Sequence, residues 1–152
     1  MRMRGRVAAV LALAALTAGC GRLGLSAKSA TTVLDVKRFE LKDVEQKDLP
    51  GAVGGKAVLF ARETSKATRE VPLKAGKYQL VVYVQAPDTE TDAIYVWVEG
   101  TETRVYPDEY GKIAPALPVA FTVKEDKAVR IALTASEETG VLLDRVEITP
   151  VP

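Results

Sequence analysis

The sequence predicts an all-β domain, a sandwich or barrel of short strands, and three observations support this fold class. After residue 32, almost every apolar segment is short and alternates with polar residues, as a strand with one buried face does. Turn signals rich in Gly, Pro and Asp separate these segments at intervals of about 8–12 residues, a spacing typical of small β-domains. No stretch in this part of the chain combines a helical period of apolar residues with helix caps.

The expected strands follow one another along the chain, which shows no internal repeat. They span residues 34–42, 57–61, 69–73, 78–85, 93–99, 102–106, 118–123, 128–134 and 141–149. The strand at 128–134 has a clear alternation, in which Val129, Ile131 and Leu133 are predicted to face the core.

The last expected strand carries an acidic residue at a predicted core position. Leu142, Val146 and Ile148 share one face of this strand, and Asp144 lies in phase with them. A buried carboxylate has to be hydrogen-bonded, paired with a cation or bound to a metal.

Two consecutive strands, at 78–85 and 93–99, carry large aromatic residues opposite an aliphatic side. If the aliphatic sides form the core, Tyr83, Tyr95 and Trp97 stand together on the outer face of neighbouring strands. Two interpretations stay open. A loop or terminal strand covers these side chains, since Tyr and Trp are usually largely buried, or they form an exposed platform for a sugar ring or a partner protein.

The first twenty residues have the pattern of an export signal. Three arginines and no acid precede ten apolar residues at 7–16, which are too few to span a bilayer. Small residues then lead to Cys20, the only cysteine of the chain. Two interpretations of Cys20 remain. It is the site of a modification, or the segment is an ordinary secretory signal in which Cys20 is a chance residue.

The segment that ends at Cys20 resembles the lipobox of bacterial lipoprotein signals, which implies a signal peptide at 1–19 and a lipid on Cys20. Residues 20–32 are small and polar and predict a flexible tether, followed by a folded domain at 33–152. Several acyl chains on one residue would anchor this domain to a membrane of the cell envelope, outside the cytoplasm. Gly21 lacks the aspartate that retains many lipoproteins at an inner membrane, which favours an outer membrane where a cell has two.

Composition argues against two function classes. Without residues 1–19, 18 basic and 20 acidic residues remain, so no net positive charge favours nucleic acid as a partner. The chain has no histidine and no G-x-S-x-G motif, and its one cysteine is assigned to the lipid, so we do not expect an enzyme.

Three segments in order resemble carbohydrate-binding modules of families 6 and 35. They are FEL at 39–41 with GGKAV at 54–58, LKAGKYQL at 73–80, and LLDRVEI at 142–148. The resemblance covers residues 33 to 148 and implies an antiparallel β-sandwich, a galactose-binding-like jelly roll.

The same resemblance implies a structural calcium site with Glu40 and Asp144 at two ligand positions. Lys42 stands where the family pattern expects a further acid, and an ammonium there repels a cation. We therefore expect Lys42 to pair with Asp144 in place of calcium, and no cofactor.

The resemblance also implies a sugar site in the loops at one end of the sandwich. The loop at 106–110 offers Tyr106, Asp108 and Tyr110 for it, although the chain has no asparagine, a residue that such sites typically use. Two functions remain. One is a membrane-anchored, non-catalytic lipoprotein that binds a glycan through the aromatic face or this loop. The other is a structural or assembly lipoprotein that binds another envelope protein and no sugar.

Overall fold

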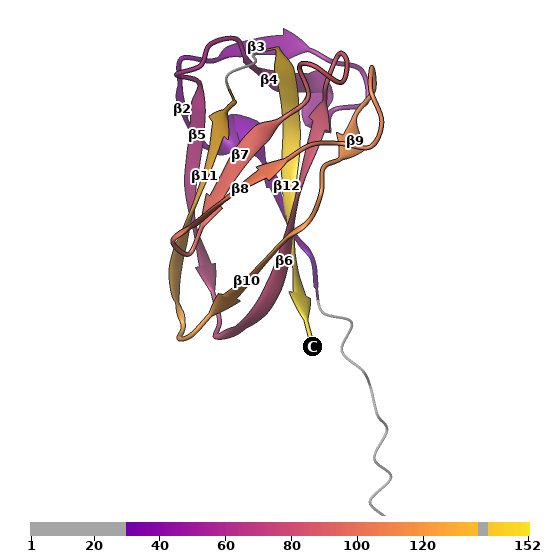
Figure 1. The fold of residues 1–152 in the computed structure, drawn as a ribbon. Helices are drawn as coiled ribbons and strands as arrows, with labels where there is room; N and C mark the ends of the chain where they lie inside the picture. Colours follow the sequence, from indigo (N-terminus) through magenta and orange to yellow (C-terminus); the bar gives the residue numbers. More distant parts are fainter. Residues whose placement is uncertain (1–29, 137–139) are drawn as a thin grey trace, which may run out of the picture.

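The computed structural model describes residues 30–136 and 140–152, which form two antiparallel sheets packed face to face (Figure 1). The all-β prediction is confirmed, and the fold is a jelly-roll β-sandwich. The predicted signal peptide at 1–19 and Cys20 lie outside the described residues, and the domain boundaries stay a prediction. Within the described residues, no helix has both the length and the apolar character needed to cross a membrane.

One sheet has seven strands and the other has five. The seven-stranded sheet has the order β10 (Val119–Val123), β6 (Gly76–Gln85), β12 (Val141–Val151), β4 (Lys56–Phe60), β3 (Glu45–Asp48), with β1 (Thr32–Asp35) also paired to β12 and β9 (Ala114–Pro115) to β6. The five-stranded sheet has the order β2 (Glu40–Lys42), β5 (Lys66–Leu73), β11 (Lys127–Ala135), β7 (Ile94–Val98), β8 (Thr101–Val105). Two short 3₁₀ turns complete the fold, η1 (Val36–Arg38) and η2 (Val53–Gly55).

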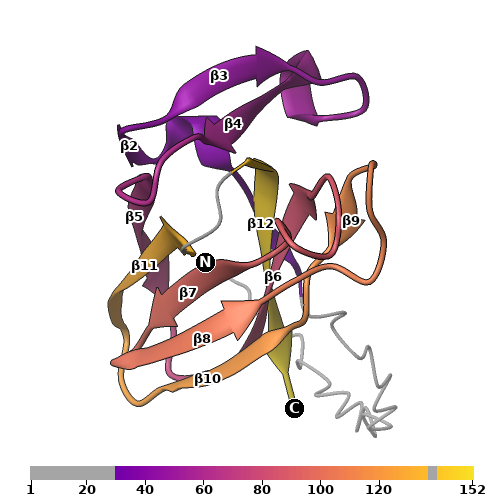
Figure 2. The same ribbon diagram turned by 45° about the horizontal axis from the view of Figure 1, so that its top comes forward.

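The core lies between the two sheets and is made of the aliphatic sides of their strands. Val129, Ile131 and Leu133 of β11 are fully buried, as the alternation predicts. The sequence forms strands here because Val and Ile suit a half-buried pleated surface and turn residues interrupt each run. The β3–β4 hairpin lies at the end of the sandwich opposite to β10 (Figure 2).

The segment at 34–42, predicted as a single strand, is divided between the two sheets. Asp35 ends β1 in the seven-stranded sheet, and its side chain accepts a hydrogen bond from the backbone N–H of Lys37, which caps η1. The chain then crosses to the five-stranded sheet as β2. Alternation cannot reveal such a crossing, since both strands have extended backbones.

The predicted phase of the last strand is wrong for Leu142. A β-bulge between Leu143 and Arg145 shifts the register, so that Leu143 enters the core together with Val146 and Ile148. Leu142 packs instead in a small second cluster with Leu49, Ala52 and Ala57. A bulge inserts one extra residue into a strand, and it leaves Asp144 buried with only 1% of its surface exposed.

Candidate functional site

The outer face of the five-stranded sheet carries the most exposed strand aromatic side chain of the described residues. Trp97 lies on β7 between the buried Val96 and Val98, so its side chain points away from the core, and it is 37% exposed. Tyr95, two residues earlier, lies on the same side and is half-buried. We call this outer surface the Trp97 face.

Residues from all five strands share the Trp97 face, because cross-strand partners in an antiparallel sheet point to the same side. Trp97 pairs with Ala132 of β11 and with Glu102 of β8, and Tyr95 pairs with Thr134 and Arg104. Further along the sheet, the partners on this face are Thr134 with Lys66, Ala132 with Thr68, Arg130 with Glu70, Thr68 with Glu40, and Lys66 with Lys42.

Trp97 borders an open hollow of about 390 Å³ on this face. Its lining residues are Lys66, Trp97, Glu102, Arg130, Ala132 and Thr134. The small side chains of Ala132 and Thr134 lie beside the large indole in the register, which leaves room over β11. A concave surface with one aromatic ring and a few polar groups is the usual form of a small-ligand site.

The charged groups around this hollow are not paired with one another. In the part of the chain that the structure describes, the side chains of Lys66, Glu102 and Arg130 form no hydrogen bond or ion pair. A second hollow of about 490 Å³ lies on the other side of Arg130, lined by Arg38, Glu40, Thr68, Arg69, Glu70 and Arg130. It contains no aromatic ring, so it offers polar contacts without a stacking surface. Arg130 joins the two hollows into one extended polar surface.

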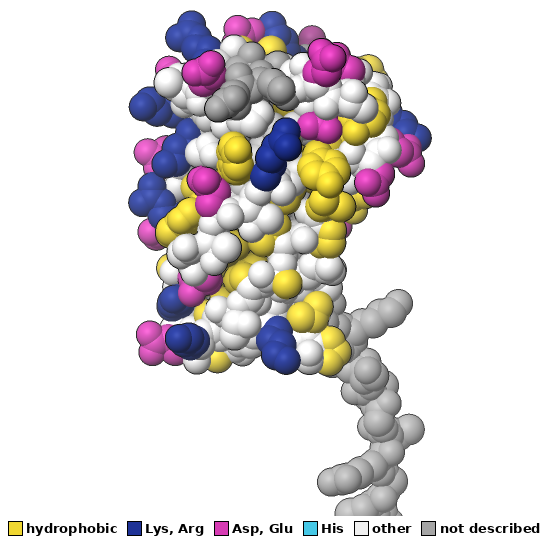
Figure 3. All heavy atoms as spheres, viewed as in Figure 1, with side chains coloured by type: hydrophobic (Ala, Val, Ile, Leu, Met, Phe, Trp, Pro, Cys, Tyr) yellow, Lys and Arg dark blue, Asp and Glu magenta, His cyan; other side chains and the backbone are white. Residues whose placement is uncertain are grey.

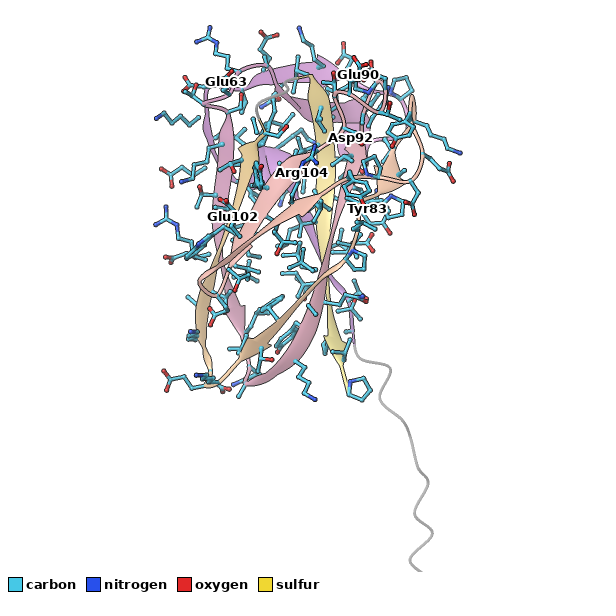
Figure 4. All side chains as sticks on the ribbon, viewed as in Figure 1. Glu63, Tyr83, Glu90, Asp92, Glu102 and Arg104 are labelled. Carbon is cyan, nitrogen blue, oxygen red and sulfur yellow. The ribbon has the colours of Figure 1, made fainter. Side chains whose placement is uncertain are left out.

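The predicted loop residues form a cluster at the β8–β9 connection, next to the Arg104 end of the Trp97 face. Tyr106 and Tyr110 are 40% and 37% exposed, and Asp108 is exposed. The hydroxyl of Tyr110 donates to the buried Asp92 at 3.3 Å, and Arg104 lies 4.0 Å from the other oxygen of that carboxylate. Figure 4 places Asp92 and Arg104 beside one another, with Glu102 farther along the same strand as Arg104.

The Tyr110 hydroxyl is protonated at neutral pH, as that of an ordinary tyrosine is, and its surroundings shift its pKa further upward. Partial desolvation raises the pKa of Tyr110, and the neighbouring Asp92 carboxylate raises it further. The hydroxyl is therefore a donor at neutral pH, and it is already used by Asp92. Tyr110 thus holds the loop to the β6–β7 connection, and only Tyr106 is left as a ring without such a contact.

The grouping of Tyr83 with Tyr95 and Trp97 is wrong. Tyr83 lies on β6 of the seven-stranded sheet, whereas the other two lie on β7 of the five-stranded sheet, so the two outer faces point away from each other. Here the chain passes from one sheet to the other between β6 and β7. Tyr83 is also covered, because the guanidinium of Arg145 lies over its ring at 3.7 Å from the centroid.

The predicted pair of Glu40 and Asp144 is also separated by the fold. Glu40 is exposed on β2 of the five-stranded sheet, and Asp144 is buried in β12 of the other sheet. Asp144 accepts a hydrogen bond from the backbone N–H of Val53 at 2.6 Å and one from Arg145 at 2.6 Å. Lys42 lies opposite Lys66 at the sheet edge, so the cation that neutralises Asp144 is Arg145 and not Lys42.

The residues present do not fit the calcium site that the family resemblance implies. Calcium takes six to eight oxygen ligands with several carboxylates. One oxygen of Asp144 accepts from a backbone amide and the other from the guanidinium of Arg145, whose positive charge repels a metal ion. Among the described residues, no group of three or more His, Cys, Asp or Glu side chains is placed to hold a metal.

Arg145 joins the two acids beside it into one network. Its Nε donates to Glu147 at 2.8 Å, and the Tyr83 hydroxyl donates to the same carboxylate at 3.2 Å. Burial disfavours the charged guanidinium, but the hydrogen bonds to Glu147 and Asp144 outweigh it and raise the pKa of Arg145. The network thus gives each of the two carboxylates a bond to Arg145.

Comparison with known proteins supports the fold. No model of a known protein family matches the sequence, and no curated protein matches it. A family 35 carbohydrate-binding module from Clostridium thermocellum is similar in structure, with a TM-score of 0.66, 14% identity, and coverage of 81% of this chain and 100% of that module. The C-terminal family 6 module of a marine laminarinase from Zobellia galactanivorans has a TM-score of 0.61 and 15% identity, covering 79% of this chain and 99% of that module.

A larger enzyme contains a similar domain. The exo-β-1,3-galactanase from Phanerochaete chrysosporium, solved with galactose, matches with a TM-score of 0.67 and 19% identity over 79% of this chain. The chain spans only 29% of the length of that enzyme. At these identities the similarity shows the fold alone, which is the jelly roll of carbohydrate-binding modules of families 6 and 35.

Proposed function

We propose that this protein is a non-catalytic lipoprotein, anchored to an envelope membrane through Cys20, that binds a glycan on the Trp97 face. One observation carries the glycan part of the proposal. Trp97 is exposed at the side of an open hollow whose other walls carry Lys66, Glu102 and Arg130. A sugar ring has a C–H face that an indole can cover and hydroxyl groups that charged side chains can bind.

The similar structures support the same class of ligand. Two of them are carbohydrate-binding modules that this chain covers almost completely. Function resides in sites and not in folds, so the shared jelly roll raises the expectation of sugar binding without assigning a sugar. The Trp97 face adds what the fold alone lacks, which is an aromatic ring with unpaired polar groups around it.

The anchoring part of the proposal rests on the sequence before the domain. A lipid on Cys20 and a tether that ends before Thr32 would lead to β1, whose first residues pair with the last strand. Thr32 is the partner of Ile148 in β12, so β1 begins beside the last part of the final strand (Figure 1). The loops at the β3–β4 end then point away from the membrane.

A binding assay against a panel of polysaccharides tests the proposal. The panel includes β-1,3-galactan and laminarin, together with neutral and acidic cell-envelope glycans. We expect at least one glycan to bind the purified protein, and Trp97→Ala to weaken it by about tenfold or more, since a central aromatic anchor carries much of the binding energy. The matched control is Tyr106→Ala, which removes an exposed aromatic ring from the loop cluster and should bind normally.

Two results would contradict the proposal. If no member of the panel binds, the glycan function is wrong. If Tyr106→Ala abolishes binding and Trp97→Ala does not, the ligand sits at the β8–β9 loop and not on the Trp97 face.

A second candidate function, contact with another envelope protein, is supported by a different surface. Tyr106 and Leu117 are both exposed, at 40% and 37%, and are joined by a backbone hydrogen bond of 3.0 Å. Hydrophobic side chains also gather on the side of the molecule shown in Figure 3, with charged side chains mainly at its rim. Site-specific photo-crosslinking in cells tests this candidate, with the crosslinker at position 117 and, as a control, at exposed position 48 on β3. If a protein partner binds at Leu117, position 117 should give one discrete crosslinked product and position 48 should give none. No product from position 117 would contradict this candidate function.

A further inference from the structure

The ammonium group of Lys37 is enclosed by oxygen atoms where η1 meets the turn before β4. Its Nζ donates to the carbonyl oxygen of Val53 and to that of Lys56 at 2.9 Å, and lies 3.0 Å from Oδ1 of Asp35. An ammonium has three donors, so these three acceptors satisfy it. The side chains of Lys37 and Asp35 are only 17% and 19% exposed, which is unusual for a lysine.

The turn that supplies the two carbonyl groups contains two glycines with positive φ angles. Gly54 and Gly55 have φ angles of 65° and 71°, which glycine adopts without the strain that a side chain would bring. This backbone directs the carbonyl oxygens of Val53 and Lys56 to the same ammonium. The other side of the turn is fixed by Asp144, which accepts from the N–H of Val53 at 2.6 Å.

We call the three oxygen atoms around Nζ, from Val53, Lys56 and Asp35, the oxygen cage. The cage can hold a small cation but offers too few ligands for calcium. Two carbonyl oxygens and one carboxylate are hard donors of the kind that a metal ion takes, but calcium needs six or more of them. The lysine ammonium is a compact point charge and needs only three. It therefore neutralises Asp35 and ties β1 to the turn before β4 with no metal ion.

We infer that Lys37 is a built-in cation of this domain. Its ammonium group neutralises Asp35 and binds the two carbonyl oxygens, as a metal ion would at this position. The stability of the fold is therefore independent of divalent cations. The sequence analysis expected Lys42 to pair with Asp144 in the place of calcium; the lysine that pairs with a carboxylate at this point of the fold is Lys37, and the carboxylate is Asp35. Exchanging Lys37 for an acid should convert the cage into a calcium site, because it replaces the cation with a second carboxylate beside Asp35.

Thermal unfolding of the full chain, followed by circular dichroism with EDTA or with millimolar calcium chloride, tests this inference. The wild-type melting temperature should be the same in both. Lys37→Met keeps the apolar stem and removes the charge, and its melting temperature should fall by about 5–10 °C in both solutions. Lys37→Glu should melt lower than wild type in EDTA, or be unfolded there, and should recover at least half of the loss with calcium.

The matched control is Lys47→Met, since Lys47 on β3 is 50% exposed and, among the described residues, pairs only with Glu45. Its melting temperature should equal that of the wild type in both solutions. A wild-type protein that is stabilised by calcium would overturn the inference, as would a Lys37→Met variant as stable as the Lys47→Met control. A Lys37→Glu variant with no calcium response would show that the oxygen atoms do not form a cation cage.

Discussion

The guanidinium of Arg145 stacks on the ring of Tyr83 at 3.7 Å while it pairs with the buried carboxylate of Asp144 at 2.6 Å. One side chain thus covers an aromatic ring and neutralises an acid. A cation over an aromatic face is attracted to it, most strongly where water is partly excluded. Tyr83 is therefore a structural residue of the seven-stranded sheet, and the exposed aromatic residue of the strands, Trp97, belongs to the other sheet.

Asp144→Ala should destabilise the domain by about 2–3 kcal/mol, because it removes the acceptor of the Val53 amide and one of the two acids that pair with Arg145. The loss stays below the 3–5 kcal/mol or so expected for a fully orphaned buried charge, since Arg145 keeps Glu147. Urea unfolding measures it. Asp48→Ala is the control, because Asp48 is 89% exposed, and it should change stability by less than about 0.5 kcal/mol. Equal stability of the two variants would contradict the structure around Asp144.

Tyr110→Phe should destabilise the domain by about 1 kcal/mol without changing glycan affinity. The variant removes the hydroxyl that donates to the buried Asp92, whose other partner, Arg104, is 4.0 Å away. The hydroxyl lies in the loop cluster and not on the Trp97 face. Parallel unfolding and binding measurements check both parts, and a loss of affinity at unchanged stability would assign Tyr110 to the ligand site.

Asp126 should make stability depend on pH at the acidic end. The hydrogen bond from Lys74 and then the one from the Ala75 amide lower the pKa of Asp126 below 3.8. A carboxyl group with a depressed folded-state pKa contributes stability above its unfolded value and loses it as the pH falls through the folded value. The melting temperature of Asp126→Asn should therefore be lower than that of the wild type at pH 7, and the difference should shrink as the pH falls below 3.8 and through the lower pKa of the folded state. A difference that is constant from pH 7 to pH 2 would show that the charge of Asp126 has no part in it.

Cys20→Ala should move the protein from the membrane fraction to the soluble fraction of the cell. The expectation follows from the basic start, the apolar run at 7–16 and the small residues before Cys20. Immunoblots of the two fractions measure it, with Ser26→Ala in the tether as the control that should stay on the membrane. An unchanged membrane level for Cys20→Ala would mean that another feature anchors the chain.

The strands that carry a clear alternation could be predicted from the sequence almost to their ends. The expected strand at 128–134 is β11, Lys127–Ala135, since each of its inward residues is apolar. The edge strand β3, Glu45–Asp48, could not be predicted, because all four of its residues are exposed and give no hydrophobic signal. Edge strands rich in charge avoid pairing with other chains.

The candidate site could be predicted only in part, for a related reason. Alternation along 93–99 places Trp97 and Tyr95 outward, and the structure agrees. Which sheet a strand joins depends on contacts between residues far apart in the sequence, so the false neighbour Tyr83 could not be separated from them. The oxygen cage around Lys37 could not be predicted from the sequence either, since two of its oxygen atoms come from the backbone of Val53 and Lys56.

The fluorescence of Trp97 during a glycan titration tests the central claim most directly, because the chain contains a single tryptophan. Its side chain is 37% exposed in the free protein, so its emission reports on the Trp97 face alone. If a sugar ring stacks on the indole, the emission should shift to shorter wavelength and saturate with the same dissociation constant as that found in an independent binding assay. A glycan that binds in that assay but leaves the emission of Trp97 unchanged would contradict the proposed site.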